Sequence, residues 1–218
     1  QPIATDMHAL GNPWISYSVY LNNSFLPGLL QLMILLVTVF SIGSEMKRAT
    51  SREWLRTADD SIIIAITGKL IPQTIIFFSM GLLYLSLLYG YLHFPMHNSI
   101  WHMIFAMFLL VVASQSFAVI IMCFAPSLRI GLSVGGLVGV LSLSIAGFSF
   151  PVPAMYLPFQ AISYVLPVRH YFLIYVDQAL NGIPYSRVHY VALILFAVAS
   201  TPLLPRLKKA LMRQVYVP

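Results

Sequence analysis

Histidine is the residue type in this 218-residue chain that most readily suggests a metal site, since the chain holds six. His93 and His97 have the i, i+4 spacing that would place two ligands on one face of a helix. Pro95 lies between them and interrupts a regular helix, and no cysteine or carboxylate accompanies the pair. We therefore expect these histidines to be polar residues at a membrane interface, and we expect no metal site.

Nucleotide or hydrolytic chemistry would need motifs that the sequence lacks. Gly68-Lys69 is followed by Leu70 and has no upstream glycine at the spacing of a phosphate-binding loop. Neither a GxSxG nucleophile elbow nor an HExxH metal motif occurs. Asp59-Asp60 stands where helix capping accounts for acidic residues. We expect no catalytic residue and no cofactor in this chain, and therefore no enzyme activity by the chain itself.

The composition describes a protein whose surface faces lipid. It is 59% apolar and only 8% charged, with a mean hydropathy of +0.86, which excludes a soluble domain. The net charge of +6 does not indicate nucleic-acid binding, because the basic residues lie between apolar runs instead of forming one stripe. A helix crosses the bilayer in roughly 17–25 apolar residues. Five runs qualify, at residues 25–42, 70–92, 100–124, 130–150 and 188–204, within a membrane domain over 25–205.

The basic residues predict the orientation of these spans. Short cytoplasmic loops carry an excess of Lys and Arg. With five alternating helices, ten of the twelve basic residues fall on one side, and only Arg169 and Arg187 fall on the other. This places the N-terminal segment 1–24 outside and the tail 206–218 in the cytoplasm. An external start with an odd number of spans leads us to expect an upstream helix and an external domain that this chain does not include.

Two of the spans carry patterns typical of helix contacts. Gly131, Gly135 and Gly139 form a strip of small residues on one helix face, which suits either close packing or a moving or dimer-forming surface. Ser114 and Gln115 lie inside an apolar run. They indicate either a hydrogen bond between helices or a polar lining for a transport path.

The longest charged stretch, residues 45–60, lies between the first two spans. Thr50 and Glu53 have the form of a capping box, which predicts a short helix over 51–56, with a second helix running from about Asp60 into the membrane. Trp54 and Leu55 would give the short helix an apolar side. Two interpretations stay open: a solvated loop on lipid headgroups, or a docking site for a cytoplasmic partner.

The stretch after the fourth span is apolar but too rich in proline to cross the membrane. Irregular backbone at membrane depth survives only where protein covers it or where it lines a cavity. We therefore predict a re-entrant helical hairpin over 151–167, placed to act as an outer gate. Arg169 and Asp177 are either partners on one helix face or unpaired interfacial charges. The predicted gate residues are Phe150, Pro151, Met155, Leu157, Pro158 and Phe159.

Three ordered motifs carry a resemblance to a known family. They are Asn12, Pro13, Pro27 and Gly28; Glu45, Thr50, Glu53 and Leu55, followed by Gly68-Lys69; and Gly147, Phe148, Phe150, Pro151, Met155, Pro158, Pro167, Tyr171 and Gly182. On these residues the whole chain resembles the C-terminal membrane half of bacterial ATP-binding-cassette exporter permeases of the type 2 class, including the drug-export and linearmycin-resistance relatives.

The resemblance implies a permease subunit in the bacterial inner membrane. Its expected partners are a cytoplasmic ABC ATPase subunit that binds ATP and Mg²⁺, a second permease copy or homologue, the lipid bilayer, and a periplasmic adaptor protein. The short cytoplasmic helix becomes a coupling helix that docks on the ATPase. The residues assigned to coupling are Glu45, Thr50, Arg52, Glu53, Trp54 and Leu55.

The alternative function is a membrane-embedded scaffold or assembly protein without transport activity. Sequence patterns alone do not separate the two functions, and ATPase activity that responds to candidate substrates would discriminate them. An apolar path suits drugs, lipids or amphiphilic peptides equally.

Overall fold

The structure of the chain is a computed structural model that describes residues 17–147, 150–183 and 187–213. These residues form helices joined by short turns, with no strand among them. Five stretches are long and apolar enough to cross a membrane, which confirms the predicted all-helical, five-span architecture. They are Leu21–Lys47, Ile62–Tyr91, Ile100–Phe124, Leu128–Ile145 and Arg187–Arg213. Residues 1–16 of the predicted N-terminal segment, Phe148, and residues 214–218 of the predicted tail lie outside the described residues.

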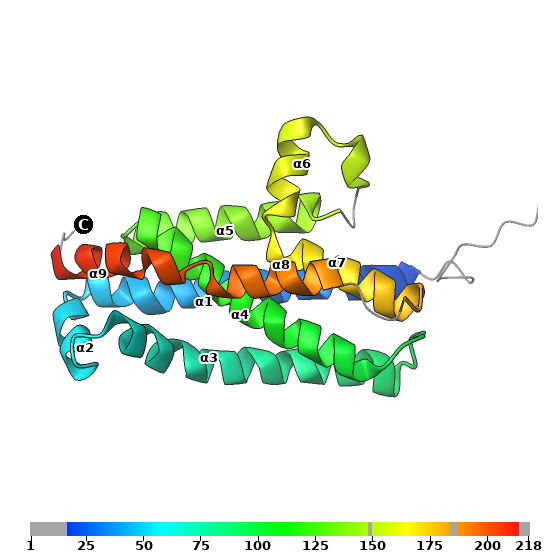
Figure 1. Ribbon diagram of the computed structural model, residues 1–218, viewed down its shortest axis with the longest axis horizontal. Helices are drawn as coiled ribbons and strands as arrows, with labels where there is room; N and C mark the ends of the chain where they lie inside the picture. Colours follow the sequence, from blue (N-terminus) through cyan, green and yellow to red (C-terminus); the bar gives the residue numbers. More distant parts are fainter. Residues whose placement is uncertain (1–16, 148–149, 184–186, 214–218) are drawn as a thin grey trace, which may run out of the picture.

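The third span, α4 (Ile100–Phe124), occupies the centre of the bundle. Most of its side chains between Met103 and Cys123 are buried. Figure 1 shows it crossing the bundle obliquely, and it packs against α1 (Tyr17–Lys47), α3 (Ile62–Leu85) and α8 (Arg187–Val198). Its bounds equal those of the apolar run, because a helix surrounded by other helices needs apolar side chains on every face.

The first span, α1, is longer than the apolar run 25–42. Its early turns contain Asn22 and Asn23, two polar residues that a hydropathy scale scores as unfavourable in a membrane helix. Tyr84 donates a hydrogen bond to the carbonyl oxygen of Asn22 at 3.2 Å, and Tyr89 donates one to Asn23 Oδ1 at 3.1 Å. These tyrosines belong to α3 and to the π-helical turn η1 (Ser86–Tyr91) that extends it. The helix continues through polar residues because a neighbouring helix satisfies them.

The fourth span, α5 (Leu128–Ile145), presents its glycine strip to α1. A Cβ atom at Gly139 would lie 2.3 Å from Leu32 Cδ1 and 3.2 Å from Leu32 Cα. One at Gly131 would lie 2.9 Å from Val39 Cγ1. The backbones of α1 and α5 approach more closely than any side chain but glycine allows, so this face is used for packing within the chain.

Replacing Gly139 with alanine should lower the free energy of unfolding by about 1–3 kcal/mol, because the new methyl group overlaps Leu32. Gly136 is the matched control on the same helix. Its Cβ would meet only Leu36 Cδ2 at 3.8 Å, so Gly136→Ala should be neutral or stabilising by up to about 1 kcal/mol through helix propensity. Thermal unfolding of both variants in one detergent measures the difference. Equal shifts would contradict the α1–α5 contact.

After α5 the chain breaks into short elements. They are η2 (Val152–Ala154), α6 (Leu157–Tyr164), α7 (Pro167–Tyr175) and the π-helical turn η3 (Val176–Leu180). Figure 1 shows α6 standing off the side of the bundle next to the end of α5. In contrast, α7 packs against α4 and α8. The prolines therefore divide the segment into a projecting part and a buried part.

The last span bends at η4 (Thr201–Leu203) and continues as α9 (Leu204–Arg213). Leu204, Leu207 and Leu211 are buried on one face of α9. The first part of the predicted cytoplasmic tail is thus an amphipathic helix. It lies beside the short helix α2 (Ser51–Thr57) at one end of the bundle (Figure 1).

Candidate functional site

The predicted short helix forms as α2, one residue longer than expected. Leu55 is completely buried and Ser51 nearly so, and both anchor α2 to α3, α9 and the end of α1. The opposite side of the helix is exposed and charged. We call this side, made of Arg52, Glu53 and Arg56, the α2 surface. A partner that docks on α2 would therefore meet charged side chains, while Leu55 holds the helix to its own bundle.

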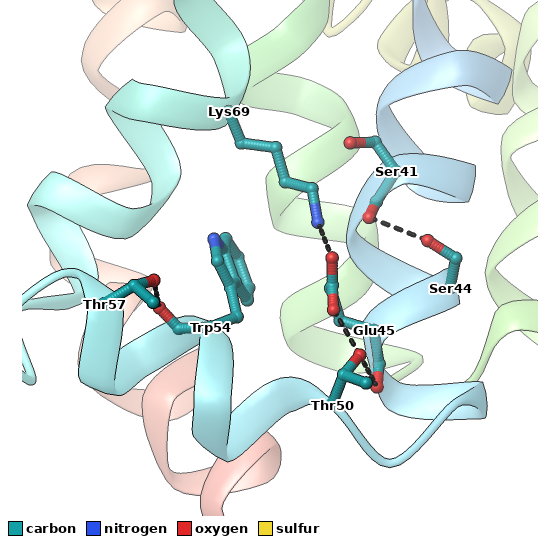
Figure 2. A network of polar contacts seen from close by, with 7 residues as sticks. All are labelled: Ser41, Ser44, Glu45, Thr50, Trp54, Thr57 and Lys69. Carbon is teal, nitrogen blue, oxygen red and sulfur yellow. Dashed lines mark hydrogen bonds and ion pairs between the residues drawn. The ribbon is translucent and has the colours of Figure 1, made fainter.

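A polar network fixes the corner where α1, α2 and α3 meet (Figure 2). Lys69 Nζ on α3 forms an ion pair with Glu45 Oε1 on α1 at 2.5 Å. The other carboxylate oxygen of Glu45 accepts a hydrogen bond from the hydroxyl of Thr50, which precedes α2. Lys69 Nζ also lies 4.4 Å from the centroid of the Trp54 ring, in a cation–π contact. The charge pair that joins α1 and α3 is therefore also in contact with α2, through Trp54, and with the residue that precedes it, Thr50.

The start of α2 differs from the capping box that the sequence predicted. Thr50 makes no side-chain hydrogen bond to a backbone N–H of the helix. Its hydroxyl donates to Glu45, which lies five residues earlier in α1, and Glu53 is exposed. The prediction was wrong on this point because a charged acceptor from the preceding helix competes with the local cap.

The turn after α2 and the place of Trp54 also differ in detail. α3 begins at Ile62, since Asp59 and Asp60 adopt left-handed φ angles of 53° and 54°, which Asp tolerates better than most residues. Trp54 is half-buried below Lys69 and packs against the core cluster around Leu55. Its indole is engaged within the chain.

The polar cluster of α4 joins helices. Gln115 Oε1 accepts a hydrogen bond from Thr74 of α3 at 2.8 Å, and Ser116 Oγ accepts one from the backbone N–H of Ser200 at 3.1 Å. Ser114 donates to the carbonyl oxygen of Leu110 within α4. Gln115 and Ser116 also line a cavity of about 290 Å³ between α3, α4 and the last span. The geometry favours the interhelical interpretation, with a small, mainly apolar cavity beside the two polar residues.

The predicted gate residues are exposed. Leu157 is 81% exposed, and Phe150 and Phe159 are about half exposed, as is typical of apolar residues that lipid or another protein covers. Met155 is half-buried, and Pro151 and Pro158 are exposed. We call the exposed apolar set, Phe150, Tyr156, Leu157 and Phe159, the α6 surface. It is the projecting part of the segment, so it is available to a neighbouring molecule.

The turn before the α6 segment is built around Arg169. α5 ends at Ile145, earlier than the predicted Phe150, because Gly147 turns the chain with a φ of +102°. Arg169 Nη1 donates to the carbonyl oxygen of Ala146 at 3.1 Å, at the negative end of the α5 dipole. A Cβ at position 147 would lie 2.6 Å from that nitrogen. Burial lowers the pKa of the Arg169 guanidinium.

Arg169 adopts neither arrangement that the sequence left open. It forms no ion pair with Asp177 and is not at an interface, since it is 8% exposed. Its guanidinium carbon lies 4.7 Å from the centroid of the Tyr164 ring of α6. Arg169 therefore links α5, α6 and α7.

Two histidines join α7 to α8. His170 Nδ1 and His189 Nδ1 are 3.4 Å apart, and His170 Nε2 lies 3.0 Å from the carbonyl oxygen of Tyr164. Burial lowers the pKa of His170, which favours the neutral imidazole. The pair is a partly buried link between two helices.

Gln31 is the most connected residue that sequence reasoning missed. It is 1% exposed in the middle of α1. Its Oε1 accepts a hydrogen bond from the backbone N–H of Val168 at 2.8 Å, and its Nε2 donates to Ser142 Oγ at 3.0 Å. Ser142 in turn donates to the carbonyl oxygen of Val138 at 2.7 Å. An amide inside the first apolar run was the available signal, because intramembrane polar residues need partners.

Nearly the whole chain matches one known protein family. A family model described as an ABC-2 family transporter protein matches residues 1–204, which include α2, α6 and four complete spans. The chain belongs to this family. A comparison with curated proteins finds no match.

Membership of the ABC-2 family makes the chain the multi-pass membrane subunit of a transporter, which associates with an ABC ATPase subunit and is not an enzyme by itself. Residues of two of the three motifs quoted from the sequence lie at the α2 corner and in the segment after α5. Glu45, Thr50 and Lys69 meet at the α2 corner, and Pro167 and Tyr171 lie in the buried part of the segment after α5.

Proposed function

We propose that this ABC-2 family chain is the permease subunit of an ATP-driven exporter in the bacterial inner membrane, with α2 on the cytoplasmic side. A separate ATPase subunit, which holds ATP and Mg²⁺, docks on the α2 surface. The observation that carries the proposal is the α2 corner. A short helix with exposed charges contacts, through Thr50 and Trp54, the Glu45–Lys69 ion pair that joins two membrane spans.

Coupling follows from the packing of the spans. When ATP binding closes the ATPase dimer, movement of α2 displaces Trp54 and Thr50, which touch Lys69 and Glu45. These two residues belong to α3 and α1, so both spans receive the displacement. α1 is in backbone contact with α5 through Gly139, and the end of α5 leads to α6. These contacts support a mechanical route from α2 to the α6 surface in this proposal.

The exit is closed, in this proposal, by two permease copies. The α6 surface of each copy covers that of the other at the outer end, and the apolar side chains seal the path. Burial of apolar area is worth about 25 cal/mol per Å², so a seal of this kind must be opened by the ATPase. The N-terminal side of the chain is then external, as the charge distribution predicts.

A photocrosslinking amino acid at position 56 should link the permease to its ATPase subunit in membranes that contain both proteins. Arg56 is exposed on the α2 surface, whereas position 187 lies at the far end of the last span and should give no crosslink. A crosslink at 187 and none at 56 would overturn the orientation and the docking site together.

Trp54→Ala should weaken association with the ATPase by about 1 kcal/mol, roughly fivefold in dissociation constant, because α2 loses the cation–π contact with Lys69 that helps to hold the docking helix in place. Trp101→Ala is the matched control, since Trp101 is 73% exposed at the start of α4. Affinity of purified permease for the ATPase measures both. If Trp54→Ala assembles and transports as the unmodified protein does, α2 is a helix resting on headgroups. A complex without substrate-dependent ATPase activity would support the scaffold alternative.

A further inference from the structure

An apolar groove lies at the end of the molecule where α9 packs beside α2. It has a volume of about 340 Å³, within the range of about 300–1,000 Å³ that is typical of ligand pockets. Its walls come from the turn between α4 and α5, the end of α1, and α9. Phe124, Pro126, Ile130 and Ala210 form much of the lining, and Arg213 is the charged residue that lines it.

Positive charge gathers along one edge of this groove. Arg206, Ala210 and Arg213 have the spacing i, i+4, i+7, so they share one face of α9, while Leu207 and Leu211 are buried on another. Arg206 lies with its guanidinium carbon 4.5 Å from the centroid of the Phe124 ring, a lining residue. Within the described part of the chain, neither arginine forms an ion pair with an acidic side chain.

The remaining surroundings are also basic. Arg129 is exposed and directly precedes the lining residue Ile130. Among the described residues that line the groove, Ser127 is the only one besides Arg213 with a polar side chain, and its hydroxyl caps α5 by accepting from the N–H of Ile130. An apolar groove with cationic groups at its edge complements a molecule that has an apolar tail and an anionic head.

We propose that this groove binds an anionic phospholipid of the cytoplasmic leaflet, with an acyl chain against Phe124, Ile130 and Ala210 and the phosphate on Arg206 and Arg213. Basic pockets between helices on the cytoplasmic side suit such headgroups, and guanidinium groups bind phosphate in a bidentate way. The proposal rests on the orientation with α2 in the cytoplasm and does not depend on transport. An acidic protein surface would suit the arginines but leave the apolar groove unused.

The lipid would also stabilise the α2 corner. Arg52 of α2 donates to the carbonyl oxygen of Met212 in α9 at 3.2 Å, and Lys208 donates to the carbonyl oxygen of Asp60 at 2.6 Å. α9 therefore contacts the start of α2 and the turn that follows α2. A phospholipid bound in the groove would fix α9, which forms one wall, and α9 would in turn hold α2 in the position seen here.

Native mass spectrometry of the full chain, titrated with dioleoylphosphatidylglycerol or dioleoylphosphatidylcholine, tests the site. We expect tighter binding of the anionic lipid. The double variant Arg206→Gln/Arg213→Gln should weaken that binding about tenfold or more. Lys47→Gln/Arg56→Gln is the matched control, since it removes two exposed charges from the same end outside the groove and should change binding less than twofold. Ala210→Phe keeps every charge and fills the groove, so it should weaken binding also.

Four results would overturn the proposal. Equal affinity for the two lipids would show that the site does not recognise the anionic headgroup. An equal loss in the control pair would show diffuse surface attraction, and an unchanged affinity in a folded Ala210→Phe variant would place the acyl chain elsewhere. Inorganic phosphate that displaces the lipid at similar concentration would identify a site for free anions. The unliganded melting temperature of each variant verifies that it is folded.

Discussion

Shortening Met155, Leu157 and Phe159 to alanine together should make the reconstituted transporter leak small solutes or raise its basal ATPase activity, with assembly intact. Leu157 and Phe159 are exposed in this chain, 81% and 46%, and belong to a helix that stands away from the bundle. Their removal therefore costs the fold of one copy little. If two copies seal the exit with these side chains, the variant loses the apolar area that keeps the seal closed.

The matched control for this triple variant is Ile75→Ala/Ile76→Ala/Leu83→Ala on α3. These side chains are 60–62% exposed along a membrane span, where lipid covers them. Leak from liposomes loaded with a small dye, with and without ATP, separates the two triple variants. If the α6 variant stays tight and transports at the rate of the unmodified protein, the segment is an outer cap. In that case the gate lies elsewhere in the path.

The spans and the short cytoplasmic helix are predictable from sequence because each depends on local properties. A run such as 100–124 forms a helix wherever lipid or apolar neighbours surround it, since backbone groups have no other partner. α2 is predictable for a similar reason, since a charged stretch between two spans must leave the membrane. Prolines after residue 150 predict a broken segment because each removes a backbone donor.

The contacts that organise the sites are not predictable from local patterns. Gln31 meets the N–H of Val168 across 137 residues, and Lys69 meets Glu45 across 24. Arg169 was interpreted with Asp177 because they are close in sequence, yet its partner is a helix end 23 residues away. A polar residue inside an apolar run indicates that a hydrogen-bond partner exists in the folded protein. Which partner it finds depends on how the helices pack.

Replacing Gln31 with methionine should lower the free energy of unfolding by about 1–3 kcal/mol and release the start of α7. Methionine has a similar volume, so no cavity adds to the effect. α7 begins with Pro167, which has no N–H, and the next donor, that of Val168, is accepted by Gln31 Oε1. The first N–H groups of a helix have no partner within it. Without Gln31, a buried donor remains unsatisfied, which costs more than the loss of an ordinary hydrogen bond.

Ser142→Ala separates the two halves of the Gln31 contact. It removes the acceptor for Gln31 Nε2 but leaves the backbone N–H of Val168 capped. The side-chain amide can reorient, whereas the backbone N–H cannot, so Ser142→Ala should cost about 1 kcal/mol, less than Gln31→Met. Thermal unfolding in detergent compares the two variants. The dye-leak assay adds a functional readout, because α6 joins the bundle through Val165 and Leu166, directly before the capped end of α7. Equal destabilisation by Gln31→Met and Ser142→Ala would show that the cap on α7 contributes nothing. A larger effect of Gln31→Met, accompanied by leak, would make this amide the residue that holds the outer segment to the membrane spans.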